Sequence, residues 1–179
     1  MVDSAYNLID SAIVTSSTTA VDLDNMSSSY DVYYFVLADV KFASTGYLQV
    51  KPKVSNSVVT GFNSNTAGMR RIMTSGNQTS YSNSTIGGTR EYIAQTGYQL
   101  TATAGGNEFM EGWIMNSQSD SHNTYLNINY VGNEDSNIGH YGHAGWEYDD
   151  ASVLTGIRIN ASTGNILNGK FYLYGLDKA

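Results

Sequence analysis

The clearest regular feature of the chain is an alternation of apolar and polar residues with a period of two. It is strongest in YDVYYFVLADVKF, Tyr30 to Phe42, where both alternating sets are apolar near the middle. Successive side chains of a strand point to opposite faces, so this run predicts a long central strand covered on both sides. Gly46–Val54 follows after a Ser-Thr-Gly turn, and we expect a hairpin with the first run. Pro52 lacks an N–H group, which predicts that the second strand ends there or lies at an edge.

Shorter alternating runs continue along the chain. YNLIDSAIV and TAVDLDNM precede the central run, NEFMEGWIMNSQ and NTYLNINYVGN are expected to pair, and SVLTGIRIN and GKFYLYGL predict the last two strands. A further hairpin is expected over residues 89–105. Between Ser55 and Gly88 only Val58–Val59 and Met69–Met73 carry enough apolar content for short strands, so we expect exposed loop elsewhere in that stretch.

These patterns predict the fold class. No segment keeps a 3.6-residue period over three turns, and about ten short strands are expected. The prediction is a single all-β domain over residues 1–179, a jelly-roll-like β-sandwich of antiparallel strands. In its last strand Phe171 and Leu173 are expected in the core. Tyr172 and Tyr174 would lie on the other face, covered by a neighbouring subunit or loop.

Composition and charge narrow the possible partners. The chain has 9 Lys+Arg against 16 Asp+Glu, a net charge of -7, and no basic stripe of the kind that sequence-independent nucleic-acid binding requires. It has 0 Cys, which excludes disulfides and thiolate chemistry. No apolar run approaches the roughly 18 residues of a membrane span, and the first residues do not resemble a secretory signal. We therefore expect neither nucleic acid nor membrane as a partner.

The strongest candidate for a chemical site is the stretch HYGHAGWEYDD. His140 and His143 lie near Glu147, Asp149 and Asp150, and imidazole with carboxylate can bind zinc, nickel or copper. Two histidines three residues apart on a strand would face opposite sides, however. We therefore interpret the stretch as a solvated or subunit-contact loop and predict no metal and no cofactor.

Catalytic motifs are missing from the sequence. Glu108 and Glu111 are a possible glycosidase pair, but three residues apart on a strand they point to opposite faces rather than across one cleft. No G-x-S-x-G elbow holds a serine, and neither Gly-Gly pair leads into a helix with a P-loop lysine. We predict that the protein is not an enzyme.

Aromatic residues outside the expected core are the better signal of function. Sugar-binding modules stack pyranose rings on such residues, and subunit interfaces are enriched in them. The candidate residues for contact with another subunit or a partner are Tyr141, Trp146, Tyr148, Tyr172 and Tyr174. For a β domain with only 14% charged residues, we favour the subunit interface.

Three stretches carry a resemblance to a known family. The opening LIDSAIVTSSTTAVDLDNMSSSYDVYYFVLADVKFASTGYLQVK, the central FMEGWIMN and the closing LTGIRINASTGNILNGKFYLYGL are similar to strands of small jelly-roll structural proteins of tailed-bacteriophage virions, particularly from marine and cyanobacterial phages. The match spans nearly the whole chain as an ordered set of strands. The closing part resembles that family's last strand pair.

The resemblance implies a function that composition and spacing cannot give. It implies a homotrimer on the outer surface of the virion, most simply a capsid decoration (cement) protein that binds the major capsid protein and stabilises the shell. The alternative is the receptor-binding head of a tail or capsid fibre that recognises host-surface glycans. A third possibility is a secreted-type carbohydrate-binding module or hydrolase accessory domain. The resemblance transfers no catalytic residue.

Overall fold

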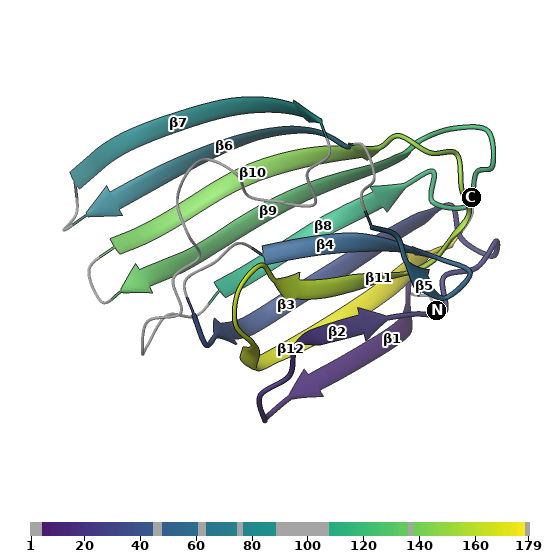
Figure 1. Ribbon diagram of the computed structural model, residues 1–179, viewed down its shortest axis with the longest axis horizontal. Helices are drawn as coiled ribbons and strands as arrows, with labels where there is room; N and C mark the ends of the chain where they lie inside the picture. Colours follow the sequence, from purple (N-terminus) through teal and green to yellow (C-terminus); the bar gives the residue numbers. More distant parts are fainter. Residues whose placement is uncertain are drawn as a thin grey trace.

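The protein consists of two packed antiparallel β-sheets. The computed structural model describes residues 5–44, 48–60, 64–74, 77–88, 108–135 and 138–177, and contains strands but no helix in these ranges. The larger, eight-stranded sheet has the order β1 (Tyr6–Val14), β12 (Ile166–Leu176), β3 (Val32–Phe42), β8 (Glu108–Met115), β9 (Thr124–Asp135), β10 (Ile138–Tyr148), β6 (Ser64–Thr74) and β7 (Asn77–Gly88). The four-stranded sheet has the order β2 (Ala20–Leu23), β11 (Leu154–Ala161), β4 (Leu48–Val54) and β5 (Ser57–Val58) (Figure 1).

The path of the chain through the two sheets is that of a jelly roll. Strands β1-β12-β3-β8 of the large sheet face β2-β11-β4-β5 of the small sheet, and the chain changes sheet after β1, β2, β3, β5, β10 and β11. The hairpins β6–β7 and β9–β10 follow β5 and β8, and both extend the large sheet beyond β8 (Figure 1). The prediction of an all-β, jelly-roll-like sandwich is therefore confirmed.

Several predicted pairings differ from the structure. β3 and β4 do not form a hairpin, because they belong to different sheets, and β11 and β12 are separated in the same way. β8 does pair with β9, as expected. Two stretches are strands where we expected loop: β6 with β7, of which only Met69–Met73 was predicted as a short strand, and β10, which contains HYGHAGWEY. Ladder hydrogen bonds use only the backbone and so do not require apolar side chains. The hairpin predicted over residues 89–105 lies outside the described residues.

A β-bulge in β3 decides which of its residues reach the core. Buried positions alternate from Tyr33 to Leu37 and then continue at Val40 and Phe42. The pairing with β8 shifts register between Leu37 and Val40, and Asp39 has a φ of 56°. One extra residue at a bulge exchanges the two faces of a strand. The bulge thus explains why Val40 and Phe42 are buried although they belong to the alternating set opposite to Tyr33, Phe35 and Leu37.

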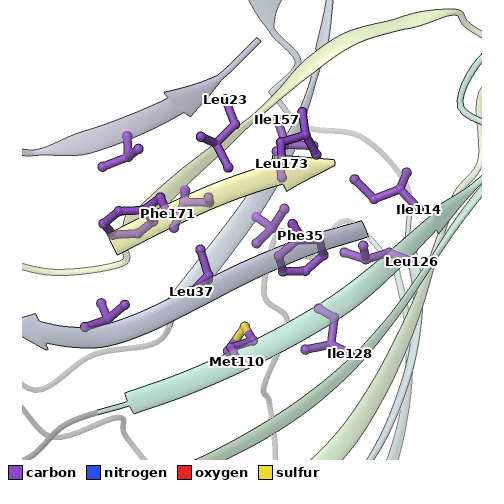
Figure 2. Close-up of a cluster of buried hydrophobic side chains, with 14 of the residues drawn as sticks. Leu23, Phe35, Leu37, Met110, Ile114, Leu126, Ile128, Ile157, Phe171 and Leu173 are labelled. Carbon is purple, nitrogen blue, oxygen red and sulfur yellow. The ribbon is translucent and has the colours of Figure 1, made fainter. Parts of the chain in front are cut away.

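The core fills the space between the sheets. Leu23 and Ile157 of the small sheet face Phe35, Leu37, Phe171 and Leu173 of the large sheet, with Met110, Ile114, Leu126 and Ile128 extending the cluster (Figure 2). Phe171 and Leu173 are fully buried, which confirms their predicted place. Each such side chain contributes about 1.5–3 kcal/mol relative to exposure.

Candidate partner-binding face

The side of the large sheet that points away from the small sheet, called the outer face below, carries most of the exposed apolar side chains. Strand alternation sends every second residue there. Tyr172 and Tyr174 lie on it, between the core residues Phe171 and Leu173. Tyr174 and Tyr172 each belong to a row of cross-strand partners that runs over six strands. One row is Leu8, Tyr174, Tyr34, Trp113, Asn127 and Gly145, and the next is Ser11, Tyr172, Val36, Glu111, Asn129 and His143.

Five rings from four strands form an aromatic cluster on the outer face: Tyr6, Tyr34, Trp113, Tyr172 and Tyr174. The ring centroids of Tyr34 and Trp113 are 4.7 Å apart, and those of Tyr6 and Tyr34 are 5.7 Å apart in an edge-to-face arrangement. Tyr172 stacks on Tyr174 at 6.4 Å. Such pairs contribute about 0.5–1.5 kcal/mol beyond the burial of area, so the cluster is a rigid surface.

Apolar side chains surround the aromatic cluster. Those exposed on the outer face are Tyr6, Leu8, Ile13, Phe109, Met115, Tyr125, Val131 and Tyr141, with Ile13 at 67% and Leu8 at 57%. From the spacings of a sheet, these positions are spread over an area of roughly 24 by 20 Å that also contains polar residues. The largest apolar patch of a monomer is often functional. The outer face is therefore the best candidate for a binding surface.

One hydrogen bond anchors the aromatic cluster to a carboxylate. The hydroxyl of Tyr34 donates to Oε2 of Glu111 on the neighbouring strand at 2.5 Å. Burial, and then the hydrogen bond to Glu111, raise the pKa of Tyr34 well above its usual value. Tyr34 therefore remains a neutral donor, and Glu111 is held in one orientation.

A second set of outer-face positions, called the amide block below, lies on β8 to β10: Glu111, Trp113, Asn127, Asn129, His143 and Gly145. Nδ1 of His143 donates to Oδ1 of Asn129 at 3.1 Å. The side-chain amide of Asn127 makes no hydrogen bond to any other described residue. Gly145, its cross-strand partner, adds no side chain. The amide block therefore offers polar groups that are held in place but not fully bonded.

A carboxylate at the end of the amide block is also held. The Tyr125 hydroxyl donates to Glu147, and this hydrogen bond is the main cause that raises the pKa of Tyr125. Nδ2 of Asn123 donates to Oε1 of Glu147 at 2.9 Å and to Oδ1 of Asp149 at 3.1 Å. The tyrosine and the asparagine together fix the orientation of Glu147.

The structure describes the side chains of four of the five predicted contact residues, and three of these four lie on the outer face. Tyr141 is exposed on the outer face, and Tyr172 and Tyr174 are half-buried there. Tyr148 is only 2% exposed, so its prediction as a surface contact is wrong. It lies on the inner face of β10, where burial and then the Asp150 carboxylate raise its pKa to about 12. The fifth residue, Trp146, is described only by its backbone, which pairs with Leu126 and Thr66.

The structure does not bring the candidate metal-binding and catalytic residues together into one site. His140 and His143 belong to strand β10 rather than to a loop, at positions of opposite parity. Glu108 is buried and Glu111 lies on the outer face, as their spacing predicts. Within the ranges given above, no three His, Asp or Glu side chains lie close enough to hold a metal ion. A search of the same ranges finds no helix with the length and hydropathy of a membrane span.

A hollow of about 370 Å³ lies between β1 and β2. It is lined by Ala12, Ile13, Val14, Thr15, Ser16, Thr18, Ala20, Val21 and Asp22. The carboxylate of Asp22 accepts two hydrogen bonds from Arg158. The lining thus provides hydroxyl groups and one carboxylate that is already bonded, which is no catalytic set.

The sequence interpretation missed the main residues of the outer face. It placed the candidate contacts mainly on β10, whereas Tyr34, Trp113 and the two asparagines of β9 come from strands read chiefly as core. A signal was present in FMEGWIM, where the residues alternating with Met110 and Ile114 include Phe109, Glu111 and Trp113. Aromatic residues on the second face of a core strand are what identify this surface.

Comparisons with known proteins give no family. No family model matches the chain, and no curated protein matches its sequence. One similar solved structure is a Bacteroides ovatus protein described as a structural-genomics target of unknown function. The two chains are 7% identical, and the match covers 87% of this chain and 98% of that chain with a TM-score of 0.25. A TM-score this low carries no argument about fold or function.

Proposed function

We propose that the protein is a non-enzymatic structural component of a phage virion, a decoration protein that binds the outer capsid as a homotrimer. The observation that carries this proposal is the aromatic cluster on a flat, rigid sheet. The virion and the capsid partner come from the sequence resemblance described above. The geometry supports a binding role over catalysis, because polar groups of the outer face are spread over a surface and not around a cleft.

The aromatic cluster suits contact with another protein. Interface cores are enriched in Tyr, Trp, Phe and Met and depleted of charge, and this is the composition around Tyr34, Tyr172 and Tyr174. Large rings that are already packed lose little conformational freedom on binding. A trimer that covers these rings and bridges capsid subunits would add contacts that must break before the shell opens.

A capsid-binding assay tests the proposal. Protein added to undecorated capsids is expected to bind in stoichiometric amounts and to raise the temperature at which the capsids release DNA. Replacing both Tyr172 and Tyr174 with Ser is expected to weaken binding by about tenfold or more, the equivalent of about 1.4 kcal/mol. The control is Val153→Ser, which removes an exposed apolar side chain in the loop before β11.

Three results would contradict the proposal. Binding to tail tips or cells instead of capsids would favour a fibre head. Equal capsid binding by the double variant and the Val153→Ser control would remove the aromatic cluster from the interface. A monomeric mass in light scattering at concentrations that saturate capsids would exclude the homotrimer.

A further inference from the structure

The polar groups of the amide block share a bonding pattern that suits an exchangeable polar ligand. Glu111 accepts from Tyr34 through Oε2, which leaves Oε1 as an acceptor. Asn129 bonds to Nδ1 of His143 through Oδ1, which leaves the Asn129 amide hydrogens as donors. Asn127 keeps both its donors and its acceptor. Each side chain is thus fixed by a hydrogen bond or by its neighbours in the sheet, and it still has a hydrogen-bond donor or acceptor that a ligand can use.

The amide block also contains a partly exposed indole and a glycine. Trp113 and Asn127 are cross-strand partners, and Asn127 is the cross-strand partner of Gly145. Among the residues whose side chains the structure describes, a Cβ atom at Gly145 would meet only the carbonyl oxygen of Leu126, at 3.6 Å. Gly145 therefore leaves the sheet backbone without a side chain of its own at this position. It lies on the strand next to Asn127, which in turn lies next to Trp113.

We propose that the amide block binds a neutral oligosaccharide, with one hexopyranose unit lying over the Trp113 and Gly145 row. The C–H face of a pyranose packs on an aromatic ring, and its hydroxyls both donate and accept hydrogen bonds. Asn127 and Asn129 supply donors, and Glu111 supplies an acceptor. This assignment goes beyond capsid binding, and the amide block shares Trp113 with the aromatic cluster.

The charge of this region selects against anionic sugars. Strands β8, β9 and β10 contain no Lys or Arg. The carboxylates of Glu111 and Glu147 both lie on the outer face, where a sialic acid or sulfate group would be repelled. A neutral sugar meets no such cost, so the unit that lies over the amide block is uncharged. Beyond the amide block, β6 places Arg71 opposite Tyr141.

Exposed rings allow contact with more than one sugar unit. Tyr125 and Tyr141 are 43% and 42% exposed, in the outer-face rows on either side of the amide block. They lie along the strand direction from Gly145, one toward each end of β10. Neighbouring units of a chain can stack on them, which favours oligosaccharides over monosaccharides.

The decisive variant adds a side chain at Gly145. The wild-type protein is first tested on an array of neutral, sialylated and sulfated oligosaccharides, and the best neutral ligand is then titrated calorimetrically. Gly145→Val is expected to weaken binding by about tenfold or more without lowering the unfolding temperature, since valine suits a strand and its Cβ fits. Asn127→Ala is expected to have a similar effect. Asn165→Ala, in the connection before β12, is the matched control and should bind normally.

Tryptophan fluorescence provides an independent readout. A sugar that packs on Trp113 should shift the emission of the wild-type protein, and the shift should be lost in Trp113→Phe although Trp146 remains. No binding of any neutral oligosaccharide at millimolar concentration would overturn the proposal. A preference for sialylated or sulfated sugars, or wild-type affinity of Gly145→Val, would overturn it as well. None of these results bears on the capsid assay, which uses no sugar.

Discussion

The two outward surfaces of the sandwich differ in the kind of side-chain contact they contain: ion pairs on the small sheet, and ring contacts with partly bonded amides on the large sheet. On the small sheet, Asp22 accepts hydrogen bonds from Nε and Nη2 of Arg158 at 2.6 and 2.7 Å. Nζ of Lys53 lies 2.5 Å from Asp24 and 3.2 Å from Asp22. Asn160 donates to Gln49 at 2.6 Å. On the outer face of the large sheet, aromatic rings and amides remain exposed.

This difference indicates that the outward side of the small sheet contributes to stability, whereas the outer face of the large sheet is available for binding. Lys53 is only 4% exposed although it lies on an outward surface, because the charged side chains around it cover it. A surface closed in this way has little to offer a partner. The outer face keeps its rings and amides available, and the cost of exposing them suggests selection for contact. We therefore expect substitutions on the small sheet to change folding and those on the outer face to change association.

The largest expected effect comes from adjacent residues of β12 that point in opposite directions. Phe171→Ala leaves a cavity in the core and should lower the free energy of unfolding by about 3–5 kcal/mol. Tyr172→Ala removes a half-buried ring from the outer face and should cost at most about 1 kcal/mol in an isolated protomer. Urea unfolding at low protein concentration measures both.

Measuring the unfolding of both variants at several protein concentrations distinguishes the core from the outer face more clearly. If the outer face is covered in an oligomer, the cost of Tyr172→Ala should rise with protein concentration, because association stabilises the folded state by mass action. The cost of Phe171→Ala should not change in that way. If Phe171→Ala and Tyr172→Ala lower the free energy of unfolding equally at low protein concentration, the outer face is part of the folding core and does not differ from it in function.

Two lysines provide the next comparison. Lys53→Ala removes the cation between Asp22 and Asp24, and we expect a loss of about 1–2 kcal/mol, less than for a fully buried pair because both carboxylates are partly exposed. Lys170 lies 3.6 Å from Asp39 with both side chains about half exposed, and Lys170→Ala should cost less than about 0.5 kcal/mol. Thermal and urea unfolding of both variants measure the difference. Similar losses would show that the small sheet is not stabilised by its charges.

Much of the fold could be predicted because strand alternation survives in the final structure. The phase of β12 was correct, since its pattern from Lys170 to Leu176 is regular. Alternation does not specify the sheet to which a strand belongs, however. In a jelly roll consecutive strands often lie in opposite sheets, which is why the β3–β4 hairpin was wrong.

The binding residues were harder to predict for a related reason. In β3 the bulge at Asp39 places Val40 and Phe42, which have the same parity as Tyr34, in the core, so the outward position of Tyr34 is hidden in the sequence. The amide block depends on register across β8, β9 and β10, and a sequence gives the faces of single strands without their lateral alignment. Tyr148 was misplaced because β10 was interpreted as a loop, for which no inner face is defined.

The smallest expected effect is the pH dependence of the small sheet. The hydrogen bond from Arg158 lowers the pKa of Asp22 below its ordinary value of 3.8, and the attraction of Lys53 adds to this. The ionised form is therefore favoured in the folded state. Its contribution to stability is complete above the unfolded pKa and is lost as the pH falls through the folded pKa. The difference in unfolding free energy between wild type and Asp22→Asn should shrink between pH 5 and pH 2 in urea titrations, whereas exposed Asp120→Asn should stay close to wild type throughout. A difference that stays constant to pH 2, or grows, would mean that Asp22 contributes by packing and not by charge.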